Sequence, residues 1–256
     1  MAKVLLVTGG ARGIGRAVVE LAATRGFDVA IGYREDRKAA DAAVAAVEAL
    51  GRKAISVQAD IASEPDIIRM FEKTETGLGP VRGLVNSAGI STRMRVDEAP
   101  ATQIEHLMAV NVTGLMLCCR EAARRMSTTH GGEGGAIGNV GSMAAALGGR
   151  PGASHYAGSK GAVDSFTKGF SREVAKEGVR VNVVRPGVTL TDMVEAVRDD
   201  PEKRKAVSAT IPMGRPAEAR EIAEPIVWLL SDQASFVTGC IVDAAGGGFV
   251  IGAGTG

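Results

Sequence analysis

The chain has little of the chemistry that marks secreted or membrane-spanning proteins. It contains only three cysteines, Cys118, Cys119 and Cys240, and an odd number with two adjacent is typical of reduced thiols, not of a disulfide framework. No apolar run approaches the ~20 residues that a membrane-spanning helix needs. The first residues lack the charged start and the cleavage site of a secretory signal. We therefore expect a cytoplasmic protein with no membrane partner.

The chain also has almost no excess of either positive or negative charge. The formal net charge is +1, aromatic residues make up 4% of the chain, and no basic run with interleaved aromatics is present. This pattern gives no source of attraction to phosphate backbones, so no nucleic-acid partner is predicted. The three histidines, His106, His130 and His155, are far apart, and no HxxxH or paired-cysteine spacing accompanies them. The sequence therefore predicts no metal site.

Short apolar runs alternate with segments of helical period along the 256 residues, of which 45% are hydrophobic. The apolar runs lie at residues 4–7, 29–33, 54–58, 83–86, 136–140, 179–184 and 240–242, and the first helical segments lie at 14–25 and 36–50. Strands that helices cover on both faces are continuously apolar, as these runs are. The sequence predicts one domain over residues 1–256, with an α/β fold: a doubly wound parallel sheet of about seven strands flanked by helices, Rossmann-like.

A glycine-rich turn joins the first apolar run to the first helical segment. It reads Thr8-Gly9-Gly10-Ala11-Arg12-Gly13-Ile14-Gly15. Glycine at positions 9, 13 and 15 lets the backbone turn tightly and approach a pyrophosphate, which the first N–H groups of the helix can bind. The turn therefore predicts a dinucleotide site, although a plain strand-to-helix turn would have the same pattern. A GxxxxGK[ST] loop is not present.

Two arginines indicate which dinucleotide binds. Arg34 follows the second apolar run, where an acidic residue commonly binds the ribose of NAD and a basic one accommodates the extra phosphate of NADP. With Arg12 in the glycine turn, two guanidinium groups are placed to bind a 2′-phosphate. We expect NADP(H), with NAD(H) second. Two alternatives stay open: Arg34 is a solvated charge, or Glu35 or Asp36 reaches the ribose instead.

Tyr156 and Lys160 begin a later helical segment and are spaced four residues apart, so they share one helix face. An ammonium beside a phenol stabilises phenolate, and we expect Lys160 to bring the pKa of Tyr156 toward neutral pH. Ser142 follows the run at 136–140, where strands of such a sheet deliver side chains to a ligand. Each residue taken singly is more often an ordinary surface or cap residue, but together with the glycine turn they indicate catalysis.

With these motifs the chain resembles the short-chain dehydrogenase/reductase family, of the compact type without an added substrate domain. The resemblance covers nearly the whole length: residues 8–15 match the family pattern TGxxxGxG, and Tyr156 and Lys160 match YxxxK, with Ser142 upstream. It implies that Tyr156 donates a proton, that Ser142 orients the substrate and that Lys160 also binds the nicotinamide ribose. Asn111 matches a fourth catalytic residue, which holds a water in a proton relay leading to the lysine.

The resemblance also implies further cofactor contacts. Asp60 and Ile61 occupy the place of the adenine contact after the third strand. The family motif NNAG reads Asn86-Ser87-Ala88-Gly89 here, differing at its second position. The expected cofactor-binding residues are Gly9, Arg12, Gly13, Ile14, Gly15, Arg34, Asp60, Ile61, Asn86, Ala88, Gly89, Tyr156, Lys160, and, from the segment that grips the nicotinamide carboxamide, Pro186, Gly187, Val188 and Thr191.

The implied activity is hydride transfer between NADP(H) and a carbonyl or alcohol: a small ketone, an aldehyde, a sugar or a 3-oxoacyl thioester. A lid over the substrate is expected within residues 190–212, and a homotetramer is expected from helices and the C-terminal strand. The helix stripe with Leu107, Leu115 and Met126 would then face another subunit or, alternatively, an intramolecular core. The other interpretation of the chain is a non-catalytic dinucleotide-binding sensor or scaffold, which has no use for the polar residues.

Overall fold

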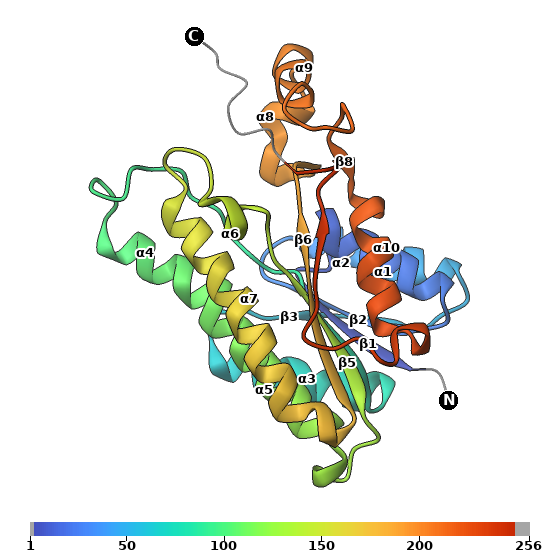
Figure 1. Ribbon diagram of the computed structural model, residues 1–256. Helices are drawn as coiled ribbons and strands as arrows, with labels where there is room; N and C mark the ends of the chain where they lie inside the picture. The colour runs from blue at the N-terminus through green and yellow to red at the C-terminus, as the bar shows by residue number, and fades with distance from the viewer. Residues whose placement is uncertain (1–2, 249–256) are drawn as a thin grey trace.

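The computed structural model describes residues 3–248, and its centre is one parallel sheet of seven strands (Figure 1). The strand order is β3-β2-β1-β4-β5-β6-β9, and every neighbouring pair is parallel. The strands are β1 (Val4–Thr8), β2 (Asp28–Tyr33), β3 (Ala54–Gln58), β4 (Val81–Asn86), β5 (Gly135–Val140), β6 (Val179–Pro186) and β9 (Ile241–Ala244). The order reverses between β1 and β4, which is where doubly wound sheets bind ligands. The predicted fold class is confirmed.

Helices cover both faces of this sheet. On one face lie α1 (Gly13–Thr24), α2 (Arg37–Ala49) and α10 (Ala219–Leu230), and on the other α3 (Glu64–Leu78), α5 (Leu115–Met126) and α7 (Ser154–Val174). The remaining helical segments are α4 (Ala101–Met108), η1 (Ala109–Gly114), η2 (Thr128–His130), α6 (Ala144–Leu147), η3 (Ala175–Glu177), η4 (Asp192–Val194), α8 (Glu195–Arg198), α9 (Pro201–Ser208) and η5 (Asp232–Ala234). The sheet is therefore the middle of three layers.

Strand β1 shows why these runs form the interior. All five of its residues are buried, and successive side chains point to opposite faces of a strand. Leu5 and Val7 pack in the apolar cluster with α1 and α10, whereas Leu6 packs in the cluster with α3 and α5. Both faces of the strand need apolar side chains, so the run is continuously hydrophobic. This pattern is what places the strand at the centre of the fold.

The helix starts differ in a way that matters for the site. The Asp36 side chain accepts a hydrogen bond from the Ala39 amide and caps α2, and Ser63 does the same for α3. Helix α10 begins with a capping box formed by Glu218 and Glu221. At α1, by contrast, no side chain among the described residues caps the helix, and its first turn holds no acidic residue. The first amides of α1 are thus left for a ligand.

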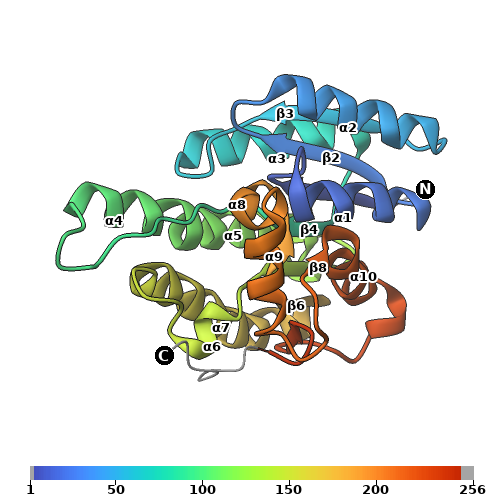
Figure 2. The same ribbon diagram turned by 90° about the horizontal axis from the view of Figure 1, so that it is seen from above.

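The segment between β6 and α10 stands outside the sheet. It contains the two-residue ladder of β7 (Thr189–Leu190) with β8 (Ala217–Glu218), together with η4, α8 and α9. Figure 2, seen from above, shows α8 and α9 between α1 on one side and α7 on the other. This is the region where a lid is expected.

Two smaller expectations can be compared with the structure. Leu107, Leu115 and Met126 are buried within this chain, so of the two alternatives for this stripe the intramolecular core is correct. Residues 246–248 of the predicted glycine-rich tail have left-handed backbone, and residues 249–256 lie outside the described part of the chain. Between residues 3 and 248, none of the helices combines the length and the apolar character that crossing a bilayer requires.

Candidate active site

The glycine turn is a close-packed cradle at the carboxyl end of β1. Gly9 has a left-handed φ of 65°, and a Cβ there would lie 2.9 Å from the backbone nitrogen of Ala88. A Cβ at Gly15 would lie 2.9 Å from the carbonyl carbon of Gly9 and closer still to its oxygen. At Gly13, with a φ of 56°, it would touch the Thr191 methyl at 3.3 Å. Side chains are therefore excluded where the backbone must come close to a ligand.

The first turn of α1 has the properties of an anion site. Its amides have no side-chain cap from residues 3–248, and the positive end of the helix favours a negative charge. Ile14 lies in this turn, and its side chain packs on the core beside the cradle. The residues present therefore fit a pyrophosphate, as the sequence predicts.

The second segment of the site is tied to the cradle. The Ala88 amide donates to Thr8 Oγ1 at 3.2 Å. Asn86 is buried and donates to Asn139 Oδ1 at 2.9 Å, which holds the ends of β4 and β5 together. Gly89 then lies against the polar cluster, because a Cβ on it would lie 3.3 Å from Asn111 Oδ1 and 3.6 Å from Lys160 Nζ.

The two arginines expected at a 2′-phosphate lie near different carboxylates. Arg34 follows β2 and pairs with Glu35 at 2.7 Å, while Arg12 lies 3.9 Å from Asp192 at the start of η4. Both side chains are about half exposed or more, so these pairs are weak and exchangeable. Of the acidic alternatives for the ribose, Asp36 is engaged as the cap of α2.

The expected adenine contact follows β3. Asp60 accepts a hydrogen bond from the Ala62 amide at 2.9 Å, and its own amide donates to Asp66 at 2.9 Å. Ile61 is buried, and its carbonyl packs directly on Gly114, where no Cβ would fit. Gly114 thus lets α5 approach this loop, a role that its sequence context, Val112-Thr113-Gly114, does not signal.

Tyr156 lies in the first turn of α7 and forms a hydrogen bond with Ser142, which follows β5. Burial raises the pKa of Tyr156 above its usual value of 10.0, and the hydrogen bond with Ser142 only partly opposes this. The expectation that Lys160 lowers this pKa is wrong for the structure. The reason is that the phenol is largely buried, while the ammonium lies 6.0 Å from the ring centroid. At neutral pH the phenol keeps its proton.

Lys160 is almost fully buried one turn further along α7. Its ammonium donates to the carbonyl oxygen of Val140, the last residue of β5, at 2.9 Å. Burial lowers the pKa of Lys160 to about 8, and the charge of Asp164 opposes that shift. The lysine is thus charged at neutral pH but close to its titration midpoint.

Asn111 lies in η1, a π-helical turn that interrupts the otherwise continuous helix from α4 to α5. Its side chain accepts from the Ile90 amide and donates to the Ile90 carbonyl, each at 2.9 Å. It also donates to Ser159 Oγ at 3.1 Å, and Ser159 donates to the Tyr156 carbonyl at 2.7 Å. Asn111 therefore joins the loop after β4 to the first turn of α7. Ser159 belongs to this connection, and nothing in its sequence context distinguishes it.

The segment expected at the nicotinamide is fixed by backbone hydrogen bonds. The Pro186 carbonyl accepts from the Met143 amide at 3.0 Å, and the Gly187 amide donates to the Ala244 carbonyl at 3.0 Å. The Val188 carbonyl accepts from Ala217 at 2.9 Å, so that oxygen is occupied. Thr191 donates to the Thr189 carbonyl at 3.4 Å, and its methyl contacts Gly13.

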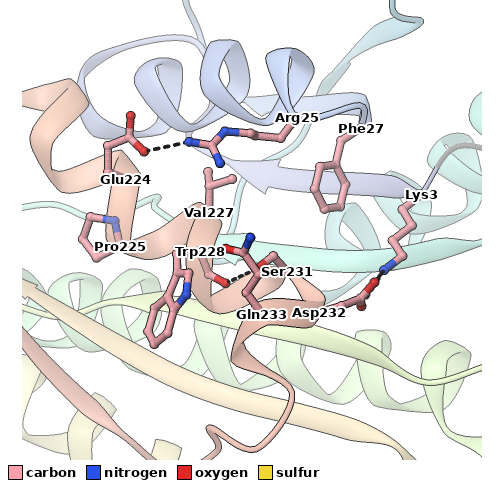
Figure 3. Close-up of a pocket in the computed structure, with 10 residues that line it drawn as sticks. All are labelled: Lys3, Arg25, Phe27, Glu224, Pro225, Val227, Trp228, Ser231, Asp232 and Gln233. Carbon is pink, nitrogen blue, oxygen red and sulfur yellow. Dashed lines mark hydrogen bonds and ion pairs between the residues drawn. The ribbon is translucent and has the colours of Figure 1, made fainter.

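A cavity away from this cluster lacks comparable catalytic groups. Figure 3 shows a cavity of about 710 Å³ that is bordered by Lys3 before β1, Arg25 after α1 and Trp228 of α10. It lies at the amino ends of the strands, whereas the cradle and polar cluster lie at the carboxyl ends. Its charged groups are already paired, Lys3 with Asp232 and Arg25 with Glu224. Across residues 3–248 no group of three potential metal ligands occurs.

A pyrophosphate cradle at the switch point of a doubly wound sheet, beside Tyr156, Lys160, Ser142 and Asn111, defines a dinucleotide-dependent oxidoreductase. Residues 9–248 match the family model described as enoyl-(acyl carrier protein) reductase. The chain belongs to the short-chain dehydrogenase/reductase family, whose members use nicotinamide dinucleotides.

Similar proteins match over nearly their whole length. The chain is 46% identical to the uncharacterized oxidoreductase YgfF of Escherichia coli, over 95% of this chain and 99% of that protein. It is 37% identical to 3-oxoacyl-[acyl-carrier-protein] reductase of Rattus norvegicus (96% and 98%) and 36% identical to L-rhamnose 1-dehydrogenase (NAD(P)(+)) of a Sphingomonas species (97% and 96%). A crystal structure of a dehydrogenase/reductase from Sinorhizobium meliloti superposes with a TM-score of 0.90, at 35% identity, over 96% and 95%.

Proposed function

We propose that this chain is a single catalytic domain that transfers a hydride between NADP(H) and a carbonyl or alcohol, with Tyr156 as the proton donor in the reductive direction. The observation that carries the proposal is the convergence of Tyr156, Ser142, Lys160 and Asn111 beside the glycine cradle. A non-catalytic sensor needs the cradle but gains nothing from a buried lysine, whose burial opposes its charge.

The residues divide the reduction between them. The nicotinamide, when bound, supplies the hydride that is added to the carbonyl carbon. Ser142 donates a hydrogen bond to the carbonyl oxygen and orients it. Tyr156 carries its proton at neutral pH because burial raises its pKa, and it gives that proton to the same oxygen. The charged Lys160 stabilises the phenolate that forms, and Asn111 holds the first turn of α7 in place through Ser159.

Cofactor choice is the finer part of the proposal. Arg34 directly follows β2, at the place expected for the ribose contact, and Arg12 lies in the cradle. Both can exchange an exposed carboxylate for a 2′-phosphate, which binds a guanidinium through charge-assisted, bidentate hydrogen bonds. A small ketone, an aldehyde, a sugar or a 3-oxoacyl thioester remains the proposed substrate class. Relatives named for a 3-oxoacyl thioester and for a sugar both support it.

We also propose a cytoplasmic homotetramer. Cys118 and Cys119 are adjacent, buried and free, and burial raises the pKa of both thiols, which suits a reducing compartment. Phe236 is fully exposed five residues before the edge strand β9, and Trp228 on α10 is 42% exposed. Large apolar side chains beside an open sheet edge support an interface with a second copy.

The test is a panel of carbonyls and alcohols followed at the nicotinamide absorbance with both cofactors. Wild type should turn over at least one member, and Tyr156→Phe should lose about 10²- to 10⁴-fold in kcat, the usual contribution of a positioned acid. Cofactor binding should persist in the variant. Full activity in Tyr156→Phe would refute the proton-donor role, and cofactor binding without turnover across the panel would favour the sensor.

A further inference from the structure

A buried carboxylate lies one helical turn beyond Lys160. Asp164 is only 6% exposed, and residues four apart on a helix are neighbours. Its Oδ2 accepts a hydrogen bond from Arg185 Nε of β6 at 2.9 Å and lies 2.7 Å from Nη2 of the same arginine. Its Oδ1 is buried and has no hydrogen-bond partner among residues 3–248. The arginine therefore satisfies only one side of the carboxylate.

The free oxygen faces the end of β5. A Cβ on Gly141 would lie 3.4 Å from Asp164 Oδ1, and Gly141 directly follows Val140, whose carbonyl accepts from Lys160 Nζ. The same short segment continues into Ser142. The side of Asp164 that Arg185 leaves open is thus turned toward the backbone that holds the lysine.

The charges around the lysine are few. Tyr156 lies one turn before it and Asp164 one turn after it on α7, and the charge of Asp164 acts on it without a direct contact. Arg185 on β6 contacts Asp164, and the half-exposed Asp243 on β9 contacts Arg185 at 3.5 Å. A buried ammonium is destabilised by loss of water, and an opposite charge within a few ångströms restores it. Asp164 is the one carboxylate of this set that is itself buried, so its field is the least screened.

We propose that Asp164 is a positioning residue for the reaction: it is the counter-ion that keeps Lys160 charged, and Arg185 fixes it in that role. The inference rests on the proposed oxidoreductase function, because it assigns the charge of Lys160 to the reductive step. Arg185 anchors one oxygen with two donors, which fixes the carboxylate and leaves the other oxygen free to act on the lysine.

The test is the pH profile of carbonyl reduction in Asp164→Asn. In wild type the alkaline limb of the profile should lie near the Lys160 pKa of about 8. Removing a buried opposite charge one helical turn away should move this limb roughly one pH unit lower. That displacement corresponds to about a fivefold loss of kcat/KM at pH 8 and little loss at pH 6. A residue with a merely structural role would lower the rate equally at both pH values.

The matched control is Asp243→Asn. It makes the same chemical change at the exposed carboxylate that contacts the same arginine. The alkaline limb of the Asp243→Asn pH profile should stay at the wild-type position because solvent screens that charge. If Asp164→Asn folds poorly by thermal melting, the double variant Asp164→Leu with Arg185→Met removes both charges together, which buried pairs tolerate, and should show the same displacement.

A second readout separates this inference from the proposed function. The ¹⁵N resonance of the Lys160 ammonium, identified by its loss in Lys160→Met, can be titrated without substrate or cofactor. Its midpoint should lie lower in Asp164→Asn than in wild type, even if no substrate in the panel is turned over. An unchanged midpoint and an unchanged limb in a folded Asp164→Asn protein would overturn the counter-ion role.

Discussion

The glycine cradle permits a sharp test, because the same substitution should have opposite effects at two helical positions. Gly15 lies in the first turn of α1 and Gly169 in the later part of α7. A Cβ at Gly169 would meet nothing within 4 Å, whereas one at Gly15 would collide with the Gly9 carbonyl. We expect Gly169→Ala to stabilise the protein and Gly15→Ala to destabilise it.

The magnitudes follow from these contacts. Alanine is favoured over glycine inside a helix by about 0.5–1 kcal/mol, and Gly169→Ala should gain that amount. Gly15→Ala gains the same propensity, but the turn must move until an ordinary contact of at least 3.4 Å is restored, and such overpacking costs about 1–3 kcal/mol. The two variants should therefore differ by roughly 2 kcal/mol, or about 4–8 °C in Tm for a chain of this size.

Thermal melting and cofactor titration together measure the effect. Gly169→Ala should bind cofactor as wild type does, since its position is exposed and away from the cradle. Gly15→Ala should bind at least tenfold more weakly, because the first amides of α1 move with the turn. Wild-type affinity and stability in Gly15→Ala would refute the close packing of the cradle.

Three further predictions concern cofactor, assembly and pH. Arg34→Ala should lose about tenfold or more in NADPH preference over NADH, measured as the ratio of kcat/KM values, and an unchanged ratio would remove Arg34 from the explanation. Phe236→Asp should shift the proposed assembly to smaller species in light scattering, with Met193→Asp, in the segment where a lid is expected, as the exposed apolar control. The folded chain holds Lys160 at a pKa of about 8, below its unfolded value of 10.5, so it binds fewer protons than the unfolded chain between these values. Stability should therefore gain a rising contribution from pH 8 to 10.5, and Lys160→Met should lack it in chemical denaturation.

The strands could be predicted because burial on both faces leaves a strong pattern. The run at 54–58 coincides with β3, and the other runs agree with their strands to within two residues at each end. The end of β6 could not be predicted from an apolar pattern. Arg185 and Pro186 are not part of the apolar run, yet they pair with Asp243 and Ala244 of β9. The ladder of β7 and β8 joins residues far apart in sequence and leaves no local pattern.

The candidate site could be predicted only where spacing fixes geometry. The spacing of four from Tyr156 to Lys160 places both on one helix face, and the glycines after β1 form the cradle. The hydrogen bond from Lys160 to the Val140 carbonyl depends on how closely α7 packs on β5, which no motif encodes. The π-helical turn that presents Asn111 needs one extra residue per turn, and that residue has no sequence signature. The pKa of Tyr156 is raised, opposite to the direction that the spacing predicts, because burial of the phenol outweighs its hydrogen bond with Ser142.

The groups proposed to handle the proton are all fixed by the ends of central strands, whereas the segment expected to cover the substrate is not. Lys160 is fixed by the carbonyl of Val140, Asn111 by the backbone amide and carbonyl of Ile90, and Ser142 stands two residues after β5. All three therefore depend on the carboxyl ends of β4 and β5, central strands whose positions are set by the apolar core on both faces. Residues 190–212 lie outside that sheet and are held by the short β7–β8 ladder, by exposed ion pairs such as Asp192 with Arg198, and by the burial of Val207 and Ile211. We therefore expect changes in this segment to alter substrate choice while the groups proposed to transfer the proton stay in place.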